Sequence, residues 1–62
     1  MPIIEVKAFA HRFEDDEKAA RLITELTEAF GAIYGEEAKR ETEVILHPIP
    51  PRLWGIGGAT RG

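Results

Sequence analysis

The stretch PIIEVKAF, residues 2–9, decides the fold of this chain. Side chains of different character alternate along it, and a period of two residues is that of a β-strand. The alternation places Ile4, Val6 and Ala8 on one face and a mixed set of residues on the other. We therefore predict a first strand here, with one face suited to a hydrophobic core.

Pro2 opens this strand directly after Met1. Removal of Met1 would convert the ring nitrogen into a free secondary amine, which can act as a general base or as an amine nucleophile. A proline also fits the first position of a strand for structural reasons alone, because its missing N–H is not needed there. Pro2 is therefore a candidate catalytic residue, with a simple strand start as the alternative.

A helix is predicted after the polar segment 12–16. Asp15 or Asp16 suits its N-cap, because a carboxylate there accepts hydrogen bonds from the first helical N–H groups and lies near the positive end of the helix dipole. Gly35 is the predicted end of the helix. Apolar residues recur between these points at spacings of three and four, which predicts a stripe that covers a sheet. The stripe consists of Ala19, Leu22, Ile23, Leu26, Ala29, Phe30 and Ile33.

A second strand is predicted from Glu41 to His47, where β-branched and aliphatic residues are frequent. Pro48, Pro50 and Pro51 are expected to end it, since proline cannot donate to a sheet ladder. The segment LWGIGG, residues 53–58, then indicates a short hairpin or an extended ribbon. Strand, helix and strand form a βαβ unit with parallel strands and a right-handed crossover. The predicted fold class is α+β, in one domain over residues 1–62.

Size and composition limit the possible functions. The chain has 62 residues and no cysteine, so disulfides cannot support a core that buries only about 60% of the unfolded surface. Two strands leave a sheet face and both edges bare, and several copies are therefore expected to pair their sheets. A net charge of −3 with mixed signs speaks against a nucleic-acid partner. Without a long apolar run or a signal-peptide pattern, we expect a cytoplasmic protein with no membrane partner.

Metal and cofactor sites are not predicted. His11 and His47 lie far apart in the sequence, and no third ligand candidate accompanies them. The GIGG run at residues 55–58 lacks the spacing of a phosphate-binding loop and indicates turn geometry instead. We therefore expect a protein that works without a metal or a cofactor.

Four features in this order resemble the 4-oxalocrotonate tautomerase family, the short-chain members of the tautomerase superfamily. They are Pro2 at the start of the PIIEV strand, Arg12 at the end of this strand, the helix core LITELTEAF at residues 22–30, and LWGIGG at residues 53–58. The resemblance covers nearly the whole chain. It implies a βαβ subunit with a short C-terminal hairpin, assembled as a hexamer of dimers in which each dimer holds a four-stranded sheet.

The resemblance also implies a tautomerase that needs no cofactor. Met1 is removed in such enzymes, and the proline amine takes a proton from a 2-hydroxy-dienoate and returns it at another carbon. Here Arg12 would bind and polarise the carboxylate of the substrate, because a guanidinium meets a carboxylate through two hydrogen bonds. Trp54 would form the apolar wall of the pocket. Burial beside Trp54 and the charge of Arg12 would both lower the pKa of the Pro2 amine.

Arg12 and Trp54 also have simpler interpretations. An arginine in this position is often a solvated loop residue or a partner in an ion pair. A tryptophan is often an anchor in an interface between subunits. Both interpretations stand beside the catalytic ones.

Glu43 stands where the well-known family tautomerases carry a second catalytic arginine. Arg40 is three residues earlier, and an odd offset along a strand directs a side chain to the opposite face. Arg40 could therefore replace that arginine only if the preceding loop curls back. A carboxylate at position 43 that faces the Pro2 pocket would raise the pKa of the amine and repel a dianionic substrate. Glu43 and Arg40 thus join Trp54 as candidate substrate-binding residues.

Three functional hypotheses follow. The first is a tautomerase of a small 2-hydroxy-dienoate or 2-oxo acid, with Pro2 as base. The second is a hydratase or dehalogenase of an unsaturated acid, with Pro2 as proton donor and Glu43 activating water. The third is an oligomeric subunit without its own activity, such as one chain type of a mixed hexamer.

Overall fold

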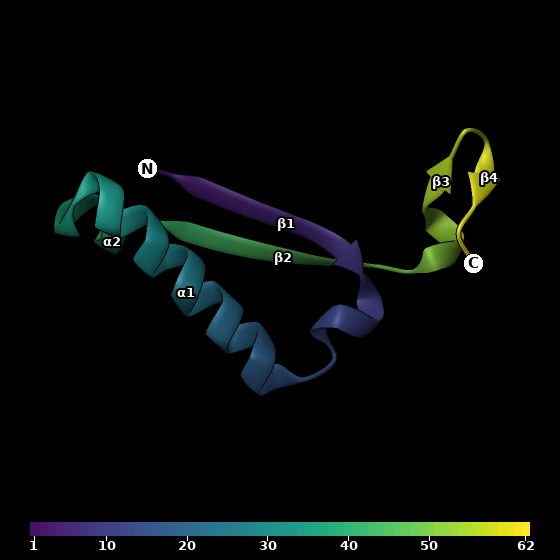
Figure 1. Cartoon of the computed structure of the whole chain (residues 1–62), viewed down its shortest axis with the longest axis horizontal. Helices are drawn as coiled ribbons and strands as arrows, with labels where there is room; N and C mark the ends of the chain where they lie inside the picture. The colour runs from purple at the N-terminus through teal and green to yellow at the C-terminus, as the bar shows by residue number, and fades with distance from the viewer.

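The computed structural model describes residues 1–62. Two strands and a long helix form the body of the chain, and a short hairpin extends from one end (Figure 1). The body contains β1 (Ile3–Phe9), the 3-10 helix η1 (Ala10–Phe13), α1 (Asp16–Tyr34), α2 (Glu36–Glu41) and β2 (Glu43–Ile49). The end segment contains the 3-10 helix η2 (Pro51–Leu53), β3 (Gly55–Ile56) and β4 (Ala59–Thr60). The predicted α+β fold with a βαβ unit and a C-terminal hairpin is confirmed.

The two long strands are parallel and in register from Ile3 opposite Glu43 to Phe9 opposite Ile49. The even-numbered residues of β1, including Ile4 and Val6, are half-buried, whereas the odd-numbered residues before Phe9 are exposed. α1 therefore covers the face that the alternation in the sequence predicts to be the inner one. The opposite face of the sheet is bare within one chain, and its Ile3 side chain is 58% exposed.

The second strand lies two residues later than predicted, at Glu43–Ile49 instead of residues 41–47, and it includes Pro48. The Glu43 N–H donates to the Pro2 carbonyl oxygen at 2.9 Å. Since backbone groups alternate along a strand, the odd-numbered residues of β2 direct their N–H groups toward β1. Pro48 is even-numbered, so the N–H that it lacks belongs to the outer edge of β2. The expectation that Pro48 ends the strand is wrong for this reason.

α1 begins and ends where the sequence predicts. The Asp15 carboxylate accepts hydrogen bonds from the Glu17 and Lys18 N–H groups at 2.9 and 3.2 Å. Gly35 follows the last residue with φ of 100°, a conformation that favours glycine. The apolar stripe is only partly covered, because a sheet of two strands is narrower than the stripe. Leu22, Leu26 and Phe30 are half-buried, whereas Ile23 and Ile33 are exposed.

α2 was not predicted, and its anchor is a lysine. Lys39 lies across Gly31 of α1, so closely that a Cβ atom at Gly31 would be 2.7 Å from the Lys39 Cβ atom. The Lys39 Nζ atom binds Glu28 Oε1 at 2.8 Å. Acidic residues in the first turn of α2 and basic residues in the last turn complement the helix dipole. This charge pattern is the signal in the sequence that could have revealed the helix.

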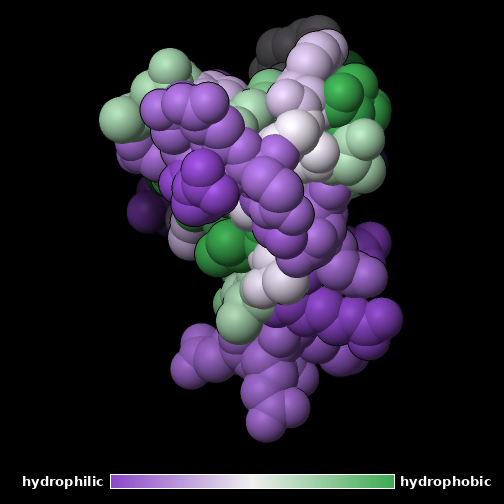
Figure 2. Space-filling model, turned by 90° about the vertical axis from the view of Figure 1, so that its left-hand side faces the viewer, coloured by the Kyte–Doolittle hydropathy of each residue, from purple (hydrophilic) through white to green (hydrophobic).

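No residue of the single chain is fully buried. The chain exposes 4842 Å², whereas a compact monomer of this size exposes about 4,000 Å². The radius of gyration of 14.3 Å likewise exceeds the value of about 11 Å for a compact domain of this length. Neither helix combines the length and the apolar content that a membrane span requires. Figure 2 looks onto the α2 end, where a mainly hydrophilic surface is interrupted by separate hydrophobic residues.

Gly31→Ala is expected to destabilise the protein by about 1 kcal/mol. Alanine favours a helix over glycine by about 1 kcal/mol, but the added methyl group would displace the root of the Lys39 side chain, and such overpacking costs about 1–3 kcal/mol. Urea unfolding at a fixed chain concentration measures the resulting change in the free energy of unfolding. Ala32→Gly, at an exposed position of the same helix, calibrates the propensity effect alone. A Gly31→Ala variant more stable than the parent chain would contradict the contact.

Candidate functional site

Pro2 is held by its carbonyl group, and its nitrogen takes no part in the sheet. The carbonyl oxygen accepts the hydrogen bond from Glu43 N–H that begins the pairing of β1 with β2. Met1 lies before the strand, and its residue is 83% exposed. The pairing of β1 with β2 would therefore survive removal of Met1.

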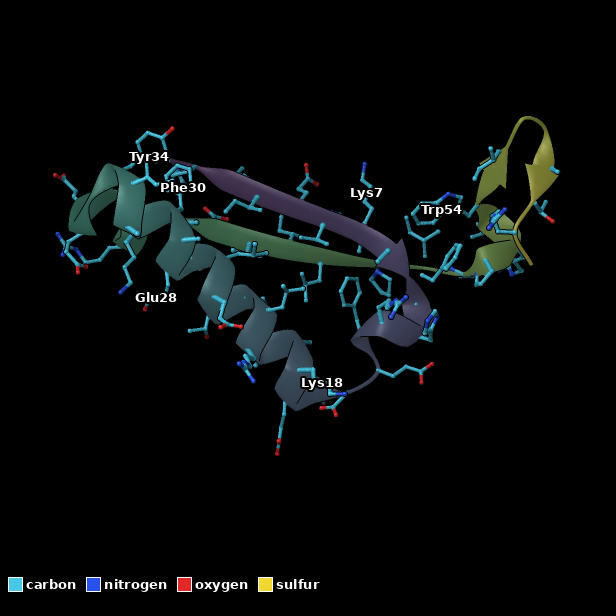
Figure 3. The ribbon with its side chains drawn as sticks, viewed as in Figure 1. Lys7, Lys18, Glu28, Phe30, Tyr34 and Trp54 are labelled. Carbon is cyan, nitrogen blue, oxygen red and sulfur yellow. The ribbon has the colours of Figure 1, made fainter.

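Arg12 and Trp54 lie at the opposite end of the sheet from Pro2. Arg12 belongs to η1, which follows the last residue of β1. Trp54 follows η2 and packs edge-on against Phe9, with ring centroids 4.8 Å apart and an angle of 67° between the rings. The strand between Pro2 and Phe9 is about 23 Å long. Figures 1 and 3 show the N-terminus and Trp54 at the two ends of the strand pair. A single chain does not bring these three candidate residues together.

Glu43 is the candidate residue that the structure places beside Pro2. It stands opposite Ile3 in the register, and its exposed side chain belongs to the bare face of the sheet. Arg40 lies nearby in the chain, in the last turn of α2. Because Arg40 lies in a helix and not in the strand or a loop, the alternation of a strand does not decide the direction of its side chain. Arg40 is exposed and forms no ion pair within the chain.

The neighbouring Lys39 already forms an ion pair with Glu28. Its hydrogen bond to Glu28 raises the pKa of the Lys39 ammonium group above the ordinary value of 10.5. The ammonium group therefore stays charged and paired throughout the neutral pH range. Thr42 Oγ1 donates to the Ala38 carbonyl oxygen at 2.7 Å and closes the end of α2 immediately before Glu43. These two contacts fix the direction in which the chain enters β2.

On the bare face of the sheet, a histidine of β2 contacts a glutamate of β1. His47 Nε2 lies 2.9 Å from Glu5 Oε1, on the diagonal between the two strands. His11 lies at the Trp54 end of the sheet instead, with its ring centroid 6.2 Å from that of Phe9. No three histidine, aspartate or glutamate side chains come close enough to share a metal ion.

Sequence reasoning missed three residues around Trp54. Phe9 forms the aromatic contact with it, and Arg52 precedes it in η2. The Arg61 N–H donates to the Trp54 carbonyl oxygen at 2.8 Å. The position of Phe9 at the end of a strand was visible in the sequence, but its pairing with a residue 45 positions later depends on the path of the chain after β2. The single chain forms no pocket, neither around Pro2 and Glu43 nor around Arg12 and Trp54.

The sequence model of the family described as "Tautomerase enzyme" matches residues 2–61. No curated protein and no solved structure matches the chain.

Proposed function

Because this chain belongs to the tautomerase family, we propose that it is a cytoplasmic keto–enol isomerase that acts without a cofactor. Its substrate would be a small 2-hydroxy-dienoate or 2-oxo acid, with Pro2 as the general base after removal of Met1. The observation that carries this proposal is the match over residues 2–61 in a chain whose Pro2 is fixed by its carbonyl group and leaves its nitrogen outside the ladder. Membership of the family indicates an isomerase of the tautomerase type in general.

The proposed reaction moves one proton. The Pro2 nitrogen accepts the proton of the enol hydroxyl group, a C=O bond forms, and the electrons of the conjugated C=C bonds shift toward a distant carbon atom. The protonated nitrogen then delivers the proton to this carbon. A base for this step needs a pKa near the working pH. An ordinary α-amino group has a pKa of about 7.7–8.0, and that of a proline amine is expected to be higher, so burial and the Arg12 charge would lower the pKa of Pro2 toward the working pH. An arginine paired with the substrate carboxylate stabilises the charge that develops on the oxygen.

The open edge of β1 is the surface through which we propose that two chains complete the site. Even-numbered residues of β1 direct their backbone groups toward β2, so Ile3, Glu5 and Lys7 direct theirs outward. The outer edge of β2 is interrupted by Pro48, which has no N–H to donate. β1 therefore offers the longer unbroken edge, and two β1 strands side by side would give a four-stranded sheet. Three such pairs would form the expected hexamer.

An antiparallel arrangement of the two β1 strands would join the separated candidate residues. Pro2 of one chain would then lie at the same end of the sheet as Phe9 of the other, and neighbouring strands are only about 5 Å apart. Arg12 and Trp54 of the second chain follow this end of its strand and its partner strand. The Arg12 charge and the Trp54 ring would act on the pKa of Pro2 across the interface, since their own Pro2 is too distant.

Pro2→Ala is expected to lower kcat/KM for ketonisation of phenylenolpyruvate by about 100- to 10,000-fold, the usual contribution of a general base. Intact-mass measurement first establishes that Met1 is absent. Lys18→Ala serves as a surface control, and circular dichroism checks the fold of both variants. Activity of the variant at the parental level would remove Pro2 from the mechanism. Activity of the purified parent chain would also exclude an inactive subunit of a mixed hexamer.

Mixing two inactive variants tests whether the site is shared. Pro2→Ala and Arg12→Ala chains, unfolded together and refolded, would form mixed pairs in which one of two sites keeps Pro2 from one chain and Arg12 from the other. Random pairing should restore about one quarter of the parental activity per chain. Each variant refolded alone is the control. Complete lack of recovery, with mixed oligomers present by mass spectrometry, would show that both residues act within one chain.

A second candidate function follows from the contact between Glu43 and Pro2. Hydration or dehalogenation of an unsaturated acid would use Glu43 to activate water and a protonated Pro2 to supply the proton. The backbone hydrogen bond of 2.9 Å brings Glu43 to the Pro2 end of the sheet. A carboxylate there favours the protonated amine and raises its pKa.

Glu43→Gln is expected to lower the pKa of the Pro2 amine, because the variant removes a negative charge beside a cationic group. An NMR titration of ¹⁵N-labelled proline measures this change, and Glu25→Gln on the exposed side of α1 is the control. A Pro2 pKa well above 8 in the parent chain supports the hydratase, whereas a value near 6 supports the tautomerase. An unchanged pKa in the Glu43→Gln variant would show that Glu43 does not act on the amine.

A further inference from the structure

Glu43 carries a negative charge beside Pro2 that pairs with no basic group of the chain. Its N–H donates to the Pro2 carbonyl oxygen at 2.9 Å. The Pro2 ring nitrogen is separated from that oxygen by the N–Cα, Cα–C and C=O bonds only. The Glu43 side chain is exposed and belongs to no ion pair. A substrate that places its reacting carbon at the Pro2 nitrogen therefore meets a free carboxylate.

The side chains next to Glu43 on the same face of the sheet are apolar. Ile3 stands directly opposite Glu43 in the register. Ile45 is two residues further along β2 and so points to the same face. Both residues are partly open to solvent, with Ile3 58% and Ile45 42% exposed. The surface around Pro2 therefore offers aliphatic contacts and one negative charge.

The Trp54 end of the sheet has the opposite charge. Residues 50–62 contain Arg52 and Arg61 and no acidic residue, and Arg12 follows β1 at the same end. None of these guanidinium groups forms an ion pair within the chain. The Trp54 ring lies at this end as well (Figure 3). This end therefore suits the carboxylate of a substrate.

The proposed antiparallel pairing of two β1 strands would bring these unlike ends together at one site. An acid bound there would place its carboxylate against the guanidinium groups of one chain and its far end against Pro2 and Glu43 of the second chain. An uncharged far end would rest on Ile3 and Ile45, whereas a second carboxylate would face Glu43. At a separation of about 6 Å and an effective dielectric constant of about 20, the repulsion between two such charges weakens binding about 100-fold.

We propose that Glu43 restricts the substrate to acids with one carboxylate and an apolar far end. The inference rests on the proposed tautomerase function and narrows its substrate class to monocarboxylic 2-hydroxy-dienoates and 2-oxo acids. Glu43 is then a specificity-determining residue, because the discrimination comes from a repulsive contact with the wrong substrate. In this role Glu43 takes no part in proton transfer, which distinguishes it from the activation of water.

Two substrates that differ only at the far end test the proposal. 2-Hydroxyhexa-2,4-dienoate ends in a methyl group, and 2-hydroxyhexa-2,4-dienedioate ends in a carboxylate. The parent chain is expected to favour the monoacid in kcat/KM, which the loss of the dienol absorbance measures. Glu43→Gln is expected to move the ratio of the two kcat/KM values about 100-fold toward the diacid. The ratio is the readout, because a change in the Pro2 amine alters the turnover of both substrates alike.

Two further variants separate the carboxylate at position 43 from other effects. Glu43→Asp keeps the charge and is expected to keep the preference for the monoacid. Glu25→Gln removes an equal charge from the exposed side of α1 and is expected to leave the ratio unchanged. In the parent chain, about 1 M salt shortens the Debye length to about 3 Å and is expected to move the ratio toward the diacid without any substitution. Circular dichroism checks the fold of each protein.

The possible outcomes separate this proposal from the proposed function. If the parent chain turns over the monoacid but has an equal or higher kcat/KM for the diacid, the charge selection is overturned and the tautomerase stands. An unchanged ratio in Glu43→Gln, or an equal shift in Glu25→Gln, overturns the charge selection in the same way. If a folded chain with a free Pro2 turns over neither dienol nor phenylenolpyruvate, both proposals are wrong.

Discussion

The parallel pairing of β1 and β2 is the constraint on which the rest of the structure depends. A parallel pair needs a long crossover, and here the crossover is α1, which supplies the cover for one sheet face. The pairing also makes both strands run in the same direction along the molecule. Both strands begin at the Pro2 end and finish at the Trp54 end, so groups that follow the strands are separated from groups that precede them. Pro2 and Glu43 lie at the first end, and Arg12 and Trp54 lie at the second.

This division explains why so small a chain is incomplete by itself. A sheet of two strands can bury one side of α1 and no more, and no side chain reaches full burial. The proposed pairing of copies would add burial that the single chain lacks. The proposed shared site fits the same arrangement, because Pro2 has Glu43 beside it but neither Arg12 of η1 nor the Trp54 ring. The proposed assembly would therefore serve both stability and function.

The elements that local physics determines were predictable from the sequence. Alternation in residues 2–9 gave the first strand and its inner face, and the Asp15 cap and Gly35 gave the limits of α1. The predicted limits of β2 were wrong, because a single backbone N–H group decides where this strand ends. Pro48 was expected to stop β2, but only the direction of its missing N–H matters, and that direction follows from the register with β1. The segment before β2 was treated as a loop, although a lysine that packs over a glycine makes it a helix. Pro2, Arg12 and Trp54 could be identified as candidates, but their separation depends on the three-dimensional path of the chain.

Pro48 has a consequence for the behaviour of the protein at high concentration. An exposed strand with every N–H free can add further strands without limit, which is how ordered aggregates grow. One edge of the strand pair here is interrupted by a residue that cannot donate, so sheet extension on that side is discouraged while the other edge remains competent. In the proposed assembly, chains would pair through the β1 edge alone, which favours a finite oligomer over a fibre. The proline that interrupts the edge of β2 would therefore limit ordered aggregation of a chain whose copies pair through β1 as proposed.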